Sequence, residues 1–320
     1  MDKAISKPGT GRPAKKKHRH WRNFVKSKTL MLMCLPTIAF FIIFSYIPMP
    51  GAYVAFVDYN YSEGIFRSPF VGLQNFTSLF SGGQLLSLTW NTFYYNALFI
   101  ITTTVGAIVI AVMLTEIGGR QFKRVTQTIM FLPYFISFVL AGLFLYAFIN
   151  YDDGFFNGLL QMIGLPKMDF YDTPHVWPVL LVLVNFWKNV GYNAVIYLGV
   201  IASLDTALNE AAAIDGASTW QRIWHITLPG IRPTVVILTL FSIGGILKGN
   251  FDLFFNTVGQ NSLLFQATDI FETYVFRSLM VNFDFSGGSA VGLYQSIFGL
   301  ILVLIANWAV RRIEPDYALF

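Results

Sequence analysis

Charged residues are scarce in this chain. Only 12% of its 320 residues are Asp, Glu, Lys or Arg, against about 25% in an average soluble domain. Hydrophobic residues make up 55% of the chain, and the mean hydropathy is +0.56. A single water-soluble core cannot bury that much apolar surface. Apolar runs of about 20 residues, enough to cross about 30 Å of hydrocarbon as a helix, recur along the chain. The sequence therefore predicts an all-α, polytopic membrane protein.

Cysteine and histidine are also rare, and two common catalytic motifs are absent. Cys34 is the single cysteine, so no disulfide can form within the chain. The histidines are His18, His20, His175 and His225, and none belongs to an H-E-x-x-H motif, so no metal site is expected. No G-x-x-x-x-G-K-[ST] motif occurs, so no phosphate-binding loop for ATP is expected. These absences argue against an enzyme and predict no cofactor on this chain.

Six apolar segments are predicted to cross the membrane as helices. The fifth is short and can extend in either direction. The predicted spans are residues 30–48, 93–114, 127–149, 177–201, 234–247 and 291–310.

The distribution of Lys and Arg predicts the orientation of these spans. Basic residues gather in an N-terminal tail (residues 1–28), in segments 118–127 and 202–233, and after the sixth span. By the positive-inside rule, both termini lie in the cytoplasm, and the tail is expected to contact anionic lipid, not nucleic acid. Residues 29–320 are then the transmembrane domain, and segments 51–91, 150–176 and 248–290 face outward as caps over the membrane mouth.

Residues 204–233 form a cytoplasmic segment that is neither a span nor a simple loop. Asp205 can cap a first, alanine-rich helix, and Gly216 supplies a left-handed turn that ends it. Ser218 can cap a second helix that runs to residue 225. Leu228-Pro229 is expected to end the pair and redirect the chain into the fifth span. From these features alone, an amphipathic surface linker is an open alternative.

The same segment has the composition of a docking surface. Its alanines let another backbone approach closely, and Glu210 and Arg222 offer polar contacts. Trp220 and Ile223 offer buried anchors. A partner bound here could push on the membrane domain.

The spacing within this segment resembles the EAA loop of bacterial ABC-importer permeases. Glu210-Ala211-Ala212 is followed by Gly216, Ile226 and Leu228-Pro229 at the family spacing, and Ala213 is a departure with no expected effect. About 90 residues with two spans follow the loop, as in the family. The chain also resembles the carbohydrate-uptake branch, particularly permeases for complex oligosaccharides and polysaccharides, in segments 46–48, 71–76, 91–92, 131–137 and 187–191.

The resemblance implies a type I ABC-importer permease fold of six transmembrane helices with a cytoplasmic coupling loop at residues 204–230. In that family the motif glutamate pairs with a basic residue on the ATPase, so Glu210 would be the ion-pairing residue and Gly216 the hinge. The implied ATPase-coupling residues are Glu210, Ala211, Ala212, Asp215, Gly216, Trp220, Arg222, Leu228 and Pro229.

The resemblance also implies the partners and the location. ATP and Mg²⁺ would be bound by two ATPase subunits, and a second, related permease chain would complete the channel. An extracytoplasmic solute-binding protein would deliver an oligosaccharide or polysaccharide. The location would be the bacterial cytoplasmic membrane, with import by alternating access.

Lys188 lies inside the fourth predicted span, where a charge costs about 2.5 to 3.5 kcal/mol. It is therefore expected to face inward, and two explanations are open. Lys188 pairs with a carboxylate or with carbonyls of a partner permease, or it lines a polar, aromatic substrate pathway and favours an acidic, uronate-type saccharide. The pathway candidates are Asn185, Trp187, Lys188, Tyr192 and Asn193.

Two other classes of membrane protein were compared with this hypothesis. An intramembrane serine protease needs a histidine at membrane depth, and neither His175 nor His225 is predicted to lie there. A secondary transporter or channel fits the six spans but has no need of a cytoplasmic docking pair. An importer permease is therefore preferred.

Overall fold

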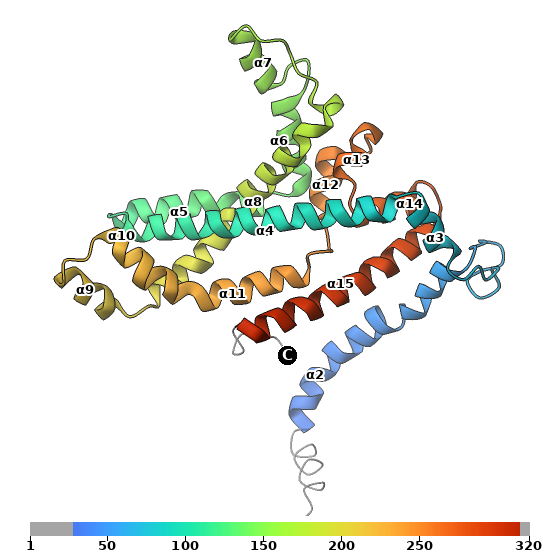
Figure 1. Cartoon of the computed structure of the whole chain (residues 1–320), viewed down its shortest axis with the longest axis horizontal. Helices are drawn as coiled ribbons and strands as arrows, with labels where there is room; N and C mark the ends of the chain where they lie inside the picture. The colour runs from blue at the N-terminus through green and yellow to red at the C-terminus, as the bar shows by residue number, and fades with distance from the viewer. Residues whose placement is uncertain (1–27, 314–320) are drawn as a thin grey trace, which may run out of the picture. The chain divides into compact units, whose positions relative to one another are not determined.

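The computed structural model describes residues 28–313, which are mainly helical (Figure 1). They fall into two units, the first ending at Tyr53 and the second beginning at Val54. The predicted basic tail lies outside the described residues, apart from its last residue, Lys28.

The first unit contains the predicted first span. Helix α2 (Lys28–Phe41) continues into a π-helical turn, η1 (Ile42–Tyr46), in which the Ile47 amide donates to the Ile42 carbonyl at 2.9 Å. A 3-10 helix, η2 (Met49–Phe56), follows. The stretch Met31–Phe56 is long and apolar enough to cross a membrane.

Long apolar helices of the second unit match most of the other predicted spans. Counting one bent pair as a single span, the described residues hold six candidate spans, in agreement with the predicted number. The long helices of this unit are α4 (Gln84–Glu116), α5 (Arg120–Phe135), α6 (Phe138–Ile149), α8 (Trp177–Ala202), α11 (Leu228–Gly244) and α15 (Phe285–Ile313).

The span predicted at residues 127–149 is present as a bent pair of helices, not as one continuous helix. Helices α5 and α6 meet at a 98° bend, and α6 projects away from the layer of α4, α5, α11 and α15 (Figure 1). Pro133 lies in the last turn of α5, Ile136 is extended, and Ser137 begins α6 by accepting a hydrogen bond from the Leu140 amide. Proline and a serine N-cap are the usual local causes of such a break.

The prediction that Leu228-Pro229 ends the second helix of the pair and redirects the chain into the fifth span is wrong. Helix α10 (Thr219–Arg222), the π-helical turn η5 (Ile223–Thr227) and α11 form one apolar helix, Thr219–Gly244. In η5 the Leu228 amide donates to the Ile223 carbonyl. This wider turn removes the clash that a proline ring makes with the carbonyl four residues earlier, so the helix continues through Pro229.

Small residues bring the central helices together. Ala107 and Ala111 of α4 pack against Ala194 of α8 in a buried cluster. Gly191 of α8 lies so close to α5 that a Cβ atom there would collide with the Met130 carbonyl. Close approach through small side chains is the common packing mode of membrane helices.

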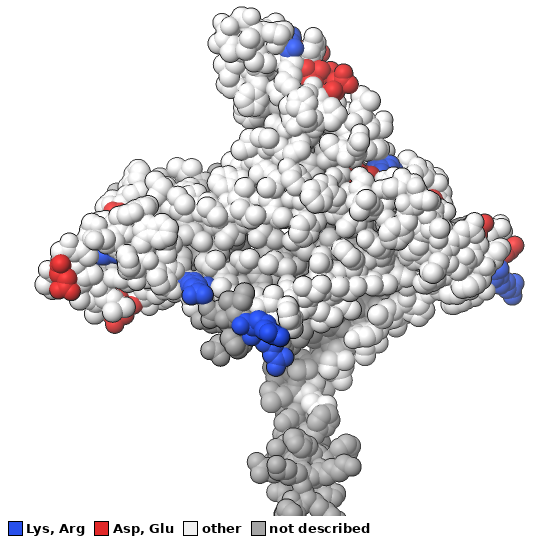
Figure 2. Space-filling view, viewed as in Figure 1, with Lys and Arg blue, Asp and Glu red and all other residues white. Residues whose placement is uncertain are grey.

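The three segments predicted to face outward fold into short helices. The first contains α3 (Gln74–Ser81), which precedes α4. The second contains α7 (Phe155–Met162), η3 (Phe170–Asp172) and η4 (Pro174–Val176), and the third contains α12 (Phe251–Val258), η6 (Ser262–Leu264), α13 (Phe265–Thr268) and α14 (Phe271–Met280). Figure 2 shows charged side chains at the ends of the long helices, with an uncharged surface over α4, α11 and α15 between them, as expected for a membrane-embedded layer.

Candidate functional site

The segment predicted to be cytoplasmic, residues 204–233, contains the predicted helix pair. The first helix is α9 (Thr206–Ile214), and the Asp205 carboxylate caps it by accepting a hydrogen bond from the Ala207 amide at 2.9 Å. Gly216 has φ +80°, the Ala217 amide donates to the Ala212 carbonyl at 2.9 Å, and the Gly216 amide donates to the Ala213 carbonyl at 3.2 Å. These two bonds form a Schellman motif, so the predicted left-handed end of the helix is confirmed.

The second helix begins with a capping box. The Ser218 hydroxyl accepts from the Gln221 amide at 3.3 Å, while the Gln221 side chain accepts from the Ser218 amide at 2.7 Å. The predicted cap at Ser218 is therefore confirmed. Since α10 continues through η5 into α11, the second helix of the pair is the end of a transmembrane helix.

Several large apolar side chains of the pair are exposed. Trp220 is 67% exposed and packs edge to face against Trp224, with ring centroids 5.9 Å apart. Leu208 and Ile214 of α9 are also exposed. Trp220 is therefore not a buried anchor within this chain, whereas Ile223 is buried. Large apolar side chains gathered on a surface usually mark a contact with a partner.

The polar members of the predicted coupling set differ in their surroundings. Glu210 is exposed, and its carboxylate forms no ion pair with any residue in the described range 28–313. Asp215 is the exposed C-cap residue of α9. Arg222 instead turns toward its own chain, where it lies 4.0 Å from Glu116 at the end of α4 and 3.2 Å from the Thr219 hydroxyl.

The five predicted pathway residues do not share one face of α8. Asn185 and Asn193 line a polar cavity, whereas Trp187 lines a separate apolar cavity of about 500 Å³ with Phe144 and Phe148. Tyr192 stacks on Tyr134 of α5, with ring centroids 4.4 Å apart and planes 13° apart. An α-helix turns by about 100° per residue, so neighbours in sequence point in different directions.

Lys188 is buried at the α5–α6 bend. Its side-chain amine donates to the backbone carbonyls of Tyr134 at 3.0 Å, Pro133 at 3.4 Å and Ile136, and it lies 4.7 Å from the centre of the Phe138 ring. The end of a helix leaves carbonyls without amide partners, and a lysine there satisfies them. The prediction that Lys188 faces inward agrees with this position, and its carbonyl partners belong to its own chain.

The polar cavity has a volume of about 620 Å³ and lies between α4, α8 and the end of α11. Asn185, Asn189 and Asn193 follow one another at every fourth position of α8. The Asn189 amide donates to the Asn185 side chain at 3.0 Å, and the Asn193 amide donates to the Asn189 carbonyl at 3.0 Å. Most of the other lining residues are polar, charged or aromatic, and include Asn96, Thr103, Ser242, Lys248, Asp252, Glu272, Phe99, Phe241 and Phe251.

Some lining residues were missed in the sequence. The spacing of Asn185, Asn189 and Asn193 at i, i+4 and i+8 would have identified Asn189, because these positions lie on one side of a helix. Lys248 and Glu272 carry no comparable signal, since a break after α11 and a later helix bring them to the cavity.

Comparison with known proteins agrees with this architecture. The family described as "Binding-protein-dependent transport system inner membrane component" matches residues 103–318. The chain belongs to this family. The predicted class, an importer permease with a polytopic α-helical fold, is therefore confirmed.

Relatives and solved structures cover nearly the whole chain. The chain is 33% identical to the polygalacturonan/rhamnogalacturonan transport system permease protein YteP of Bacillus subtilis (strain 168), over 94% of this chain and 93% of that protein. It is 31% identical to Protein LplB of the same organism, over 91% of each. It also resembles a chain in the crystal structure of a bacterial alginate ABC transporter in complex with an alginate pentasaccharide-bound periplasmic protein. For that chain the TM-score is 0.82 and the identity 32%, over 92% of this chain and 98% of the other.

Family membership gives the features described above a common context. The family consists of membrane components of transport systems that depend on binding proteins, so this chain is a multi-pass membrane subunit. The helix pair and the polar cavity are two places where such a subunit can contact other parts of its system.

Proposed function

We propose that this chain is the permease subunit of an ABC importer that moves an oligosaccharide or polysaccharide into the cytoplasm. It would form the channel with a second, related permease, with two ATPase subunits on the cytoplasmic side and a solute-binding protein on the other. Both termini would lie in the cytoplasm. The observation that carries the proposal is the exposed helix pair with the sequence Glu210-Ala211-Ala212, joined without interruption to a transmembrane helix.

The helix pair would transmit the movement of the ATPases. Glu210, with no ion-pair partner among the described residues, is available for a basic side chain of the ATPase, and the alanines beside it permit close contact. Asp215 and Gly216 end α9 and would act at the hinge. Because α10, η5 and α11 are one helix, a push on Trp220 would reach Phe241 and Ser242, which line the polar cavity.

The remaining coupling residues would connect the pair to the membrane domain. Arg222 would keep the second helix near Glu116 at the cytoplasmic end of α4, through a weak, partly exposed ion pair. Leu228 and Pro229 would transmit the push through the π-helical turn.

The polar cavity is this chain's proposed half of the saccharide pathway. Amide groups of Asn185 and Asn193 can bond sugar hydroxyls, and aromatic side chains such as Phe241 can pack against sugar rings. Trp187, Lys188 and Tyr192 lie on other faces of α8, and their contacts would stabilise the position of this helix beside the cavity. The names of the polygalacturonan and alginate transporters favour a polymeric, uronate-containing substrate.

The test is ATP hydrolysis by the complex co-purified through this chain and reconstituted with its binding protein, across a panel of neutral and acidic oligosaccharides. We expect one saccharide to stimulate hydrolysis several-fold, and Glu210→Ala to abolish the coupling of hydrolysis to uptake. Glu63→Ala is the control, since Glu63 is also an exposed glutamate but lies in the segment before α3. Without a co-purifying ATPase, a secondary transporter would become the better explanation.

A further inference from the structure

Lys248 is held at the rim of the polar cavity by a rigid piece of backbone. Helix α11 ends at Gly244, and the next residues are not helical. The Lys248 amide donates to the Gly245 carbonyl at 2.7 Å, and Ile246 and Leu247 are buried. The side chain of Lys248 is exposed and borders both the 620 Å³ cavity and a second cavity of about 510 Å³.

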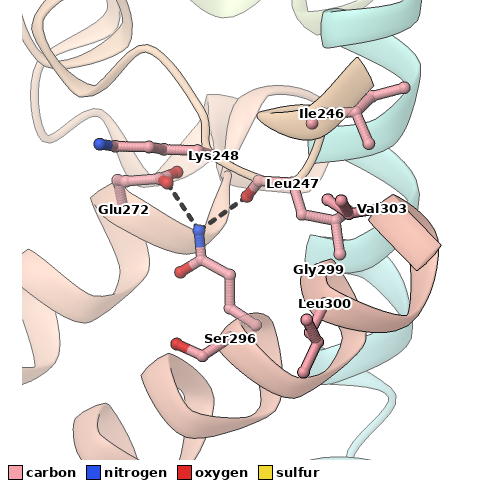
Figure 3. A pocket seen from close by; sticks show the side chains of 10 residues that line it. Ile246, Leu247, Lys248, Glu272, Ser296, Gly299, Leu300 and Val303 are labelled. Atoms are coloured by element: carbon pink, nitrogen blue, oxygen red, sulfur yellow. Dashed lines mark hydrogen bonds between the residues drawn. The ribbon is translucent and has the colours of Figure 1, made fainter. Parts of the chain in front are cut away.

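Hydrogen bonds fix the backbone on both sides of Lys248. The Gln295 side-chain amide of α15 donates to the Leu247 carbonyl and to Glu272 Oε1, at 2.7 Å each, and both bonds are drawn in Figure 3. The Gly249 amide donates to the same Glu272 oxygen at 2.7 Å. The Cα atom of Lys248 is therefore fixed, while its side chain can move.

The amine of Lys248 is available to a ligand. It donates no hydrogen bond to, and forms no ion pair with, the residues between 28 and 313 that the structure describes. Lys248 is also the single cation among the residues that line the 620 Å³ cavity. The amine of Lys188, the other lysine near this cavity, already donates hydrogen bonds to carbonyls of the α5–α6 bend.

Two carboxylates also border this cavity. Asp252 is exposed, so water screens its charge. Glu272 lies beside Lys248 (Figure 3), with Oε1 accepting two hydrogen bonds and Oε2 buried without a partner among the described residues. Burial raises the pKa of the Glu272 carboxyl, and the positive charge of Lys248 acts in the opposite direction.

A fixed cation beside amide and aromatic side chains fits one class of ligand. Hydroxyl groups and sugar rings are suited to the asparagines and phenylalanines of the cavity, and a carboxylate is suited to the amine. We propose that Lys248 is the specificity-determining residue of this chain that binds the carboxylate of an acidic saccharide. This inference rests on the proposed function and adds to it the residue that recognises the carboxylate of the substrate.

The test uses the whole reconstituted complex with its binding protein. The probes are trigalacturonate and its fully methyl-esterified form, and the loading of the binding protein with each is checked by a separate titration. Wild type is compared with Lys248→Gln and Lys248→Arg. Lys167→Gln is the control, because Lys167 is a half-buried lysine in the segment between α7 and η3, where its amine donates to the Asp152 carbonyl at 2.8 Å.

We expect Lys248→Gln to raise the half-saturating concentration of trigalacturonate-loaded binding protein about tenfold, the effect of losing about 1.4 kcal/mol of binding free energy. The maximal rate and the response to the methyl ester should not change. Lys248→Arg should restore most of the affinity, and Lys167→Gln should behave as wild type.

Equal effects of Lys248→Gln on both probes, or no effect on either, would overturn the assignment of Lys248 while leaving the importer function intact. A wild-type complex whose ATPase responds to no saccharide would instead overturn the proposed function, and this inference with it.

Discussion

Two lysines near the polar cavity have opposite surroundings. Lys188 is buried in α8, and its amine contacts three backbone carbonyls and an aromatic ring. Lys248 follows α11, is exposed, and has an amine that forms no hydrogen bond or ion pair with the described residues. The difference shows that a charged residue within a membrane span is not automatically a ligand contact. Lys188 stabilises a bend, whereas Lys248 has the freedom that substrate binding requires.

The largest effect is expected from Lys188→Met. This change removes the buried donor to the Tyr134 and Ile136 carbonyls, whereas the Pro133 carbonyl still accepts from the Ile136 amide, and it should lower the free energy of unfolding by about 3 kcal/mol. The measurement is the thermal unfolding of the purified complex in detergent. Lys167→Met is the matched control, since the exposed Lys167 amine donates to a single carbonyl, that of Asp152. Equal melting temperatures for the two variants would contradict the structural role of Lys188.

A smaller loss of stability is expected from Gln295→Leu, which removes the side-chain amide that donates to both Leu247 and Glu272. Two acceptors lose a bond, so stability should fall by about 1 to 2 kcal/mol. Amide hydrogen exchange should become faster at residues 246–250, where Lys248 is anchored. Gln161→Leu, at an exposed position of α7, should leave this exchange unchanged. Unchanged exchange in Gln295→Leu would mean that Lys248 is not held in this way.

Glu272→Gln should change the pH dependence of stability. The pKa of Glu272 is raised by burial above its ordinary value of 4.5, so the folded protein holds this proton more tightly than the unfolded chain. The stabilisation that comes from this proton is complete below the pKa that Glu272 has in the unfolded chain. It is lost as the pH rises through the pKa of Glu272 in the folded protein. Glu272→Gln cannot ionise, so its melting temperature relative to wild type should increase across that pH window. Parallel curves of melting temperature against pH for the two proteins would show that the pKa of the Glu272 carboxyl is not raised.

The smallest effect is expected from Lys248→Met. An exposed side chain without partners contributes little to folding, so stability should change by less than about 0.5 kcal/mol. Thermal unfolding of the single variant and of the double variant with Lys188→Met gives the measurement. The two changes should be additive, because the lysines share no partner. A large loss of stability in Lys248→Met would contradict the difference between Lys188 and Lys248.

Several parts of the fold could be predicted because their causes are local. Asp205, Gly216 and Ser218 set the ends of the cytoplasmic helices through bonds to residues a few positions away. The fourth span was placed almost to the residue, since an apolar run of that length and the proline near its start are both visible in the sequence. The EAA spacing indicated the family for the same reason.

Most of the missed features depend on bonds between distant segments. The bend between α5 and α6 is stabilised by Lys188, more than 50 residues away, and the rim of the cavity depends on Gln295 and Glu272. Continuity through Pro229 was missed because a π-helical turn, which propensities do not reveal, accommodates the ring.

The sequence by itself determined that this protein is a polytopic α-helical membrane subunit with a short capped helix pair before the fifth span, because apolar length and helix caps act over short distances. Only the tertiary structure decided which polar residues meet in the cavity and which lysine is available to a ligand. A residue's partners across the membrane domain come from packing, and its own position in the sequence does not specify them.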